Sequence, residues 1–131
     1  MTKAPDTVGE LMTKDVVTVG RDEPVGSALR AMLARDIGSV VVTDGGAAVG
    51  VFTERDLSRN ILDDPGLIYR PVGEVMSAPV VTAAPSEEVV FVFERMNTNG
   101  IRRLPVVQDG RLVGMVTERD LLRWVGQVAK E

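Results

Sequence analysis

Apolar residues recur along one stretch of the chain with the period of a helix. From residue 25 they lie at i, i+4, i+7 and i+8, so that all four fall on one helical face: Val25, Leu29, Met32 and Leu33. Asp22 is the candidate N-cap of this helix, and Pro24 suits its first turn. The pattern predicts an amphipathic helix whose apolar stripe, Met32 included, packs into a core.

Two apolar runs on either side of a turn predict a hairpin after this helix. Residues 38–43 form a β-branched run, and residues 47–52 form a second apolar run. The turn signal Asp44-Gly45-Gly46 joins them and favours antiparallel pairing. With a short strand at 16–18 and a last helix at about 53–61, the predicted order of elements is turn-β-α-β-β-α.

The whole pattern recurs 64 residues later without a gap. From Val8 onward, 21 of 53 aligned positions are identical, which indicates a duplication. The second copy predicts the same elements, with Ser86 as the candidate helix cap and an apolar stripe at Val89, Val92, Phe93 and Met96. We therefore expect a first repeat at 8–62, a linker at 63–71 and a second repeat at 72–126. Because a unit of about 55 residues buries little surface alone, an α+β fold is expected in which the repeats pack with pseudo-twofold symmetry.

Composition excludes several classes of function. The 131 residues include no Cys and no His, so thiol chemistry, the commonest general base and the commonest metal ligand are absent. The sequence has no apolar run of 18 residues, and Met1-Thr2-Lys3-Ala4-Pro5-Asp6 lacks the apolar stretch of a signal peptide. We expect a cytoplasmic protein without a membrane span. The net charge of −4 argues against non-specific binding to nucleic acid.

The best-preserved string lies at the last strand-to-helix junction of each repeat. It reads Gly50-Val51-Phe52-Thr53-Glu54-Arg55-Asp56-Leu57 and Gly114-Met115-Val116-Thr117-Glu118-Arg119-Asp120-Leu121. A helix N-terminus suits a phosphate, and a carboxylate one turn along can accept hydrogen bonds from a ribose diol. The alternative is a capping box, in which Asp bonds back to the Thr cap. Capping does not explain why Gly and Arg recur as well, and the two interpretations are compatible.

These motifs together resemble a pair of CBS domains, the tandem called a Bateman module. The resemblance rests on Met12-Thr13 and Met76-Ser77 after the leading turns, on Arg103-Leu104-Pro105-Val106, and on the two Gly-to-Asp strings. It covers residues 7–125. It implies two units that pack through their sheets and leave two related clefts. It also implies binding of an adenosine-containing ligand, either an adenine nucleotide (AMP, ADP or ATP) or S-adenosylmethionine, with no metal required.

The resemblance also implies roles for individual residues. In such modules the motif Asp holds the ribose hydroxyls, the motif Thr contacts phosphate, and backbone of the first and middle strands frames the adenine. These roles are carried to one site formed by Thr18, Val40, Thr53, Arg55 and Asp56, and to another formed by Thr82, Leu104, Pro105, Thr117, Arg119 and Asp120. Arg55 and Arg119 are candidate phosphate partners.

The two repeats differ most in one basic pair. Arg102 and Arg103 stand where the first repeat has Gly38 and Ser39. Basic residues at this place in the family point toward bound phosphate. The twofold relation suggests that they serve the site of Asp56, the site of Asp120 stays open as the other choice, and a solvated strand end is the alternative to both. We expect two sites of unequal affinity.

The resulting hypothesis is a regulatory module that binds its ligand without chemistry. It is expected to form a homodimer and to signal to a partner protein, because no larger domain is attached. The alternative is a structural or dimerisation module without a ligand. An enzyme would need a carboxylate-bound Mg²⁺, for which only Glu54, Asp56 and their copies are candidates. Tyr69 and Trp124 are expected to pack rather than to bind ligand.

Overall fold

The computed structural model describes residues 5–130, which form two compact units. Val16–Val80 make up one unit, and the residues before Val16 combine with those after Val80 to make the other. We name them the first-repeat unit and the second-repeat unit after the repeat that supplies most of each, and describe each by itself. Residues 1–4, which belong to the segment that lacks the apolar stretch of a signal peptide, and residue 131 lie outside the described range.

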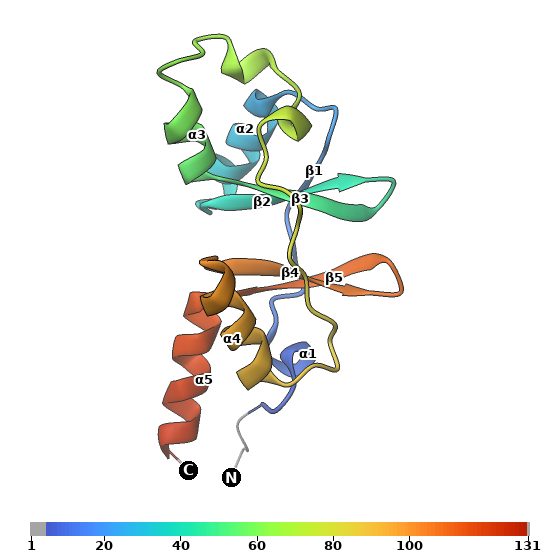
Figure 1. Ribbon diagram of the computed structural model, residues 1–131, viewed down its shortest axis with the longest axis vertical. Coiled ribbons are helices and arrows are strands. Elements are labelled where there is room, and N and C mark those ends of the chain that lie inside the picture. The colour runs from blue at the N-terminus through green and yellow to red at the C-terminus, as the bar shows by residue number, and fades with distance from the viewer. Residues whose placement is uncertain (1–4, 131) are drawn as a thin grey trace. The chain divides into compact units, whose positions relative to one another are not determined.

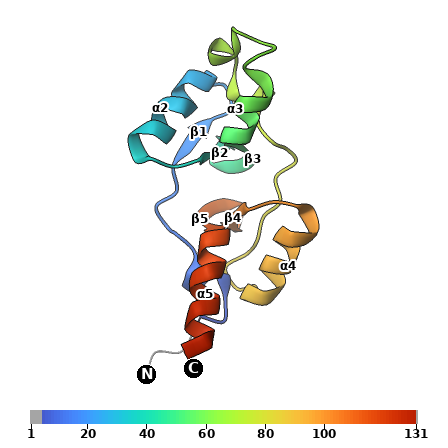
Figure 2. The same cartoon turned by 90° about the vertical axis from the view of Figure 1, so that its left-hand side faces the viewer.

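The first-repeat unit is a three-stranded sheet with two helices. Strand β1 (Thr18–Gly20) runs parallel to β2 (Ser39–Asp44), and β2 pairs antiparallel with β3 (Ala47–Thr53). Helices α2 (Val25–Arg35) and α3 (Glu54–Asn60) lie on the same face of this sheet (Figures 1 and 2). Two short 3₁₀ turns follow, at Leu67–Tyr69 and Val72–Glu74. The predicted hairpin and helices are confirmed.

The second-repeat unit has the same plan with a smaller sheet. It contains the short helix α1 (Val8–Leu11), α4 (Val89–Asn99), the antiparallel pair β4 (Arg103–Gln108) and β5 (Arg111–Thr117), and α5 (Glu118–Lys130). The strand expected before α4 is reduced to one parallel bridge between Ala83 and Val106, so this part of the prediction is wrong. Two prolines explain the loss. Pro85 occupies the position of Arg21, whose N–H donates to Thr43 O in the first-repeat unit, and Pro105 occupies that of Val41, whose N–H donates to Val17 O. Proline has no N–H, so neither bond can form in the second-repeat unit.

The predicted caps of α2 and α4 are also wrong. The helices begin two residues later than Asp22 and Ser86 would allow, and their N-cap residues, Pro24 and Glu88, make no side-chain cap. In each repeat a nearby glutamate instead accepts a hydrogen bond from a backbone N–H that lies three residues earlier, outside the helix. Glu23 accepts from Gly20 N at 2.6 Å, and Glu87 accepts from Ala84 N at 2.8 Å.

Each unit has its own apolar core. The predicted stripe on α4 is buried, and Met32 and Met96 are core residues as expected. Leu33, in contrast, is 83% exposed, so its assignment to the buried stripe of α2 was wrong. Trp124 packs 6.4 Å from the ring of Phe93, which confirms the expected packing role.

The linker between the repeats is anchored by a different residue from the one expected. Tyr69 is 80% exposed, whereas Leu67, two residues earlier, is fully buried in the core of the first-repeat unit. The 3₁₀ turn that contains both residues points only one side chain inward. Leu67 is therefore the apolar plug of the linker.

The segments that lead into the two repeats are exchanged between the units. Val8, from the first repeat, is fully buried in the core of the second-repeat unit, and Val72, from the second repeat, is fully buried in that of the first-repeat unit. The backbone of Thr13 exchanges two hydrogen bonds of 2.9 Å with Met115. Ser77 exchanges bonds of 2.8 and 3.1 Å with Val51. Each leading segment therefore completes the unit of the other repeat.

This exchange accounts for the glycine of the repeated motif. A Cβ on Gly50 would overlap Met76 Sδ and lie 3.0 Å from Ser77 O, and a Cβ on Gly114 would overlap Met12 Sδ and lie 3.0 Å from Thr13 O. The exchanged methionines therefore lie where a side chain at these glycines would be.

Replacing Gly50 by alanine should destabilise the protein by about 1–3 kcal/mol, since Met76 and its backbone have to move away from the added methyl group. Urea unfolding at equilibrium measures this change. Gly126→Ala is the control, because nothing lies within 4 Å of a Cβ on this helical glycine. It should stabilise the protein by up to about 1 kcal/mol. Equal effects of the two substitutions would contradict the role given to Met76.

Candidate functional site

The Thr-Glu-Arg-Asp motif of the first repeat forms a complete capping box. Thr53 is extended (φ −126°, ψ 166°) and caps α3, which begins at Glu54. Asp56 N–H donates to Thr53 Oγ1 at 3.2 Å. In return, Thr53 N–H and Oγ1–H donate to Asp56 Oδ2 at 2.9 and 3.1 Å. The carboxylate is only 6% exposed. These are the bonds that the capping interpretation predicts for the first repeat.

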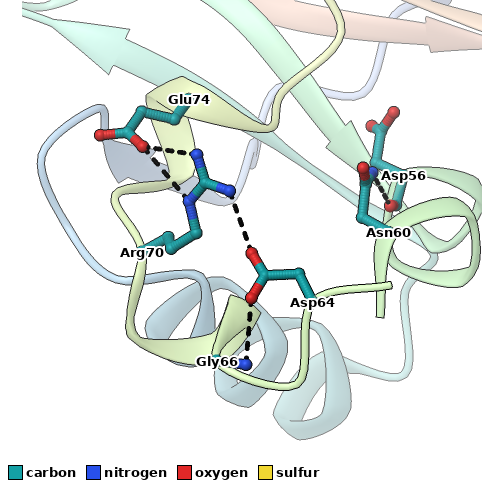
Figure 3. A network of polar contacts seen from close by, with 6 residues as sticks. All are labelled: Asp56, Asn60, Asp64, Gly66, Arg70 and Glu74. Carbon is teal, nitrogen blue, oxygen red and sulfur yellow. Dashed lines mark hydrogen bonds and ion pairs between the residues drawn. The ribbon is translucent and has the colours of Figure 1, made fainter. Parts of the chain in front are cut away.

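A residue of the exchanged leading segment holds the second oxygen of the same carboxylate. Ser77 Oγ–H donates to Asp56 Oδ1 at 2.8 Å. Asn60 Nδ2 donates to the backbone oxygen of Asp56 at 2.6 Å (Figure 3). The sequence showed Met76-Ser77 as part of a family pattern but gave no sign that Ser77 reaches Asp56, because that contact depends on the exchange.

In the second repeat, one oxygen of the motif carboxylate has different contacts from those of its counterpart in the first. Thr117 N–H and Oγ1–H donate to Asp120 Oδ2 at 2.9 and 3.3 Å, and Asp120 is 2% exposed. Asp120 Oδ1 faces Arg123 Nη1 at 3.5 Å. Thr13 occupies the position that corresponds to Ser77, but within residues 5–130 no hydroxyl donates to Asp120 Oδ1. The two buried carboxylates thus share one half of their surroundings and differ in the other.

The bonds of the motif threonines constrain what these residues can do. The hydroxyl hydrogen of Thr53, like that of Thr117, is directed at the motif carboxylate. A hydroxyl has one hydrogen to donate, so either threonine must release its Asp before it donates to a phosphate oxygen. The capping and phosphate interpretations are compatible only through this exchange of partners.

The other first-repeat candidates lie at different depths in the unit. Thr18 is exposed at the start of β1 and pairs with Val41. Val40 is 1% exposed and belongs to the core, so it could meet a ligand only through its backbone. Arg55 is exposed in the first turn of α3. Of the five candidates, Thr53 and Asp56 are joined directly by hydrogen bonds.

The corresponding second-repeat candidates are likewise partly buried and partly exposed. Leu104 and Pro105 are buried, and Pro105 O already accepts from Ala83 N at 3.1 Å. Arg119 is exposed. Thr82 is half-buried, and its backbone oxygen accepts from Arg95 Nη1 at 2.8 Å.

Arg95 fixes the backbone at Thr82 through a network that sequence reasoning missed. Its guanidinium contacts both carboxylate oxygens of Glu87, one of them at 3.0 Å. These hydrogen bonds lower the pKa of Glu87 and raise that of Arg95. The first repeat has Ala31 at the position of Arg95, so only the Thr82 backbone is held in this way.

The Arg pair lies beside the motif of its own repeat. Arg103 pairs with Thr117 across the β4–β5 ladder. Arg102 O accepts from Glu118 N at 2.9 Å, while Arg102 Nε is 4.0 Å from Glu118 Oε1. In the first-repeat unit, Gly38 O accepts the equivalent bond from Glu54 N at 3.1 Å. The backbone geometry is therefore shared, and the two cationic side chains are the difference.

An ion-pair network holds the linker in place. The leading segment that contains Ser77 follows this linker directly. Arg70 donates to Glu74 at 2.9 Å and to Asp64 at 3.0 Å, and Asp64 also accepts from Gly66 N at 3.1 Å (Figure 3). The hydrogen bond to Glu74, followed by that to Asp64, raises the pKa of Arg70. The network is exposed, so screening by solvent keeps its contribution to stability small.

A separate cavity of about 240 Å³ lies in the second-repeat unit. Phe93, Met96, Ile101 and Leu121 give it an apolar part, and Asn97, Arg102 and Glu118 a polar part, whereas Thr117 and Asp120 do not line it. Within residues 5–130 no group of three acidic residues is placed to hold a metal ion. No helix in that range is long and apolar enough to cross a membrane.

Comparison with known proteins identifies the class of domain that this fold and these motifs define. The CBS domain family matches residues 8–63 and 72–127. An uncharacterised protein of Methanocaldococcus jannaschii is 32% identical over 124 residues, which are 92% of this chain and 43% of that protein. The chain therefore spans less than half the length of this relative.

Two crystal structures are similar over nearly their whole length. One is a CBS-domain protein of Agrobacterium tumefaciens, with 32% identity, a TM-score of 0.84, and coverage of 95% of this chain and 97% of that one. The other is a CBS domain pair in complex with 5′-methylthioadenosine and S-adenosyl-L-methionine, with 28% identity, a TM-score of 0.83, and coverage of 97% and 100%. The chain belongs to the CBS domain family and is a pair of CBS domains, which confirms the resemblance and the α+β fold.

Proposed function

We propose that the protein is a regulatory module that binds an adenosine-containing ligand at the Thr-Glu-Arg-Asp motif of each repeat. The observation that carries this proposal is the pair of buried carboxylates, Asp56 and Asp120, held at the same strand-to-helix junction in both units. A structural relative bound to 5′-methylthioadenosine and S-adenosyl-L-methionine supports the ligand class.

The chemistry of a buried carboxylate suits the ribose part of such a ligand. An ionised carboxylate only accepts hydrogen bonds, and a vicinal diol presents two donors to it. Hydrogen bonds to a charged group in a water-poor place are stronger than those between neutral groups. Asp56 and Asp120 are the proposed diol acceptors. Thr53 and Thr117 are the proposed phosphate contacts, with Arg55 and Arg119 as their exposed neighbours.

The remaining candidates complete the two sites in this proposal. Thr18 and Thr82, with the backbone at Val40, Leu104 and Pro105, would frame the adenine. Arg102 and Arg103 would supply positive charge for a phosphate or a carboxylate. Since only the second repeat carries this pair, two sites of unequal affinity for anionic ligands follow. No metal enters the proposed site.

A structural module without ligand binding is the second candidate. The observation in its favour is the capping box, which satisfies the Thr53 hydroxyl and one Asp56 oxygen without any ligand. This candidate does not explain why the carboxylates of Asp56 and Asp120 are both buried, because a helix cap can be made by an exposed side chain.

A thermal-shift panel separates the two candidates. The intact protein is heated with AMP, ADP, ATP, S-adenosylmethionine or NADH. A ligand at about 100 times its dissociation constant should stabilise the protein by about 2.7 kcal/mol, which is a rise of roughly 10 °C for a chain of this size. The double variant Asp56→Ala plus Asp120→Ala should lose the shift. No shift with any compound, or the same shift in the double variant, would rule out the proposed function.

We further propose that the protein forms a homodimer through the helices of its second-repeat unit. Exposed apolar side chains gather there on α4 and α5: Val90, Phe91, Leu122, Val125 and Val128. Their counterparts in the first repeat are Gly26, Ser27, Ser58, Ile61 and Asp64. An apolar face of this kind is typical of an interaction surface. Ligand binding would then shift the dimer equilibrium, or that with a partner protein.

The double substitution Phe91→Asp plus Leu122→Asp is expected to dissociate this dimer, because it places charge at the proposed interface. Light scattering coupled to size-exclusion chromatography measures the mass directly. Leu33→Asp plus Leu62→Asp is the matched control, since both leucines are exposed in the first-repeat unit. A dimer that survives the first pair, or that the control pair also dissociates, would argue against the proposed surface.

A further inference from the structure

The two motif carboxylates offer different numbers of free acceptor positions. A carboxylate can accept about four hydrogen bonds, two at each oxygen. Asp56 already accepts three, from Thr53 N, Thr53 Oγ1 and Ser77 Oγ. Asp120 accepts two, from Thr117 N and Thr117 Oγ1. The difference is the hydroxyl of Ser77.

Ser77 is well placed to remain on Asp56. Its backbone is fixed to Val51 of β3 by hydrogen bonds of 2.8 and 3.1 Å. Its hydroxyl lies 2.8 Å from Asp56 Oδ1. A hydroxyl that is already tethered beside its acceptor competes at a high effective concentration. It is therefore harder to displace than a water molecule.

Asp120 Oδ1 has a more mobile neighbour. Arg123 Nη1 lies 3.5 Å from it, and this side chain is 65% exposed. An exposed arginine held by one long contact contributes little and can turn away. Thr13, which occupies the place of Ser77, keeps the backbone bonds to Met115, but within residues 5–130 its hydroxyl makes no bond to Asp120.

We propose that Ser77 is a specificity-determining residue that occupies, on Asp56 Oδ1, the place of one hydroxyl of a vicinal diol. With Ser77 in place, the Asp56 site accepts one ligand hydroxyl, whereas the Asp120 site accepts both. The first repeat therefore discriminates weakly between a ribose and a deoxyribose, and the second repeat discriminates strongly. The comparison does not depend on Thr53 and Thr117, because they make the same bonds to their carboxylates. This inference rests on the proposed function and deepens it.

The test is a titration of the full chain with adenosine and with 2′-deoxyadenosine, followed by NMR. Amide signals from residues 53–57 and 117–121 report the two sites separately. Ser77→Ala should raise the affinity for adenosine at the Asp56 site about three- to tenfold, the fold change expected for one hydrogen bond. It should also raise the preference for adenosine over 2′-deoxyadenosine at this site.

Two further variants make the result specific. Ser77→Thr keeps the hydroxyl and should behave as the parent chain does. Thr13→Ala removes the corresponding hydroxyl of the other leading segment and should change neither site. The amide spectrum of each variant shows whether the first-repeat unit remains folded, and Ser77→Thr then tests the proposal if Ser77→Ala does not fold.

The outcomes separate this inference from the proposed function. If Ser77→Ala leaves the adenosine affinity unchanged or lowers it, Ser77 is not a competitor and the inference is wrong. The inference is also wrong if Ser77→Thr changes the preference for adenosine over 2′-deoxyadenosine that the parent chain shows at the Asp56 site. A parent chain that binds neither nucleoside while a compound of the thermal-shift panel does bind would also overturn it. Absence of binding by every compound would overturn the proposed function itself.

Discussion

Replacing Val8 by aspartate is expected to open the second-repeat unit and to leave the first-repeat unit folded, although Val8 belongs to the first repeat in the sequence. Val8 is fully buried among the apolar residues of the other repeat. An unpaired charge in such a place costs several kcal/mol, which is a large share of the stability of a small domain. Hydrogen exchange should show loss of protection in β4 and β5, while β2 and β3 keep theirs.

The reciprocal substitution and a control complete this experiment. Val72→Asp should open the first-repeat unit instead, since Val72 is fully buried in that core. Lys14→Asp changes the charge of the same leading segment as Val8, but at an exposed position, and should leave both units protected. If Val8→Asp exposes the amides of β2 and β3 rather than those of β4 and β5, the exchange of leading segments does not occur in solution.

Single substitutions of the motif aspartates are expected to remove one ligand site each. Asp56→Asn and Asp120→Asn keep the side-chain volume and one acceptor oxygen, so that Thr53 can still cap α3 and an oxygen remains to accept from Thr117 N. The loss of charge and of one acceptor should weaken ribose binding at the altered site by roughly ten- to a hundredfold, because a hydrogen bond to a charged group contributes about 1.5–3 kcal/mol. Isothermal titration calorimetry with AMP measures the remaining site.

The pair of variants also tests the inequality of the sites. Asp120→Asn should cause the greater loss for an anionic ligand if Arg102 and Arg103 serve the site beside which they lie. A greater loss in Asp56→Asn would assign the Arg pair to the other site. Ser58→Ala is the control, since Ser58 is exposed on α3 and donates only to Arg55 O within its own helix. It should bind AMP as the parent chain does.

Most of the secondary structure could be predicted from the repeat pattern. Where a prediction was wrong, the cause is local. The hairpins follow from β-branched runs around turns in which Gly45, Gly46, Asp109 and Gly110 adopt positive φ. The helices follow from the apolar stripes. The strand predicted before α4 shrinks to one bridge because Pro85 and Pro105 stand at the positions of Arg21 and Val41, and only Arg21 and Val41 have an N–H to donate to the neighbouring strand.

Only part of each candidate site could be predicted from the sequence. The contact between Thr53 and Asp56 spans three residues of one helix start, so it is a local property that a motif can predict. The contact between Ser77 and Asp56 spans 21 residues and two elements. A motif cannot show such a contact, because it depends on the path that the chain takes after the linker.

The sequence by itself determined the duplication, the family and most elements of each repeat, and it offered the capping bonds as one of two interpretations. Repeats, periodicity and contacts between near neighbours can all be read from the order of the residues. Tertiary structure alone decided that Val8 and Val72 exchange places, that Met12 and Met76 lie over the motif glycines, and that Ser77 reaches Asp56. The physical reason is that an apolar segment gains the same free energy from either of two similar cores. Chain geometry, and not the identity of its residues, selects the core in which it is buried.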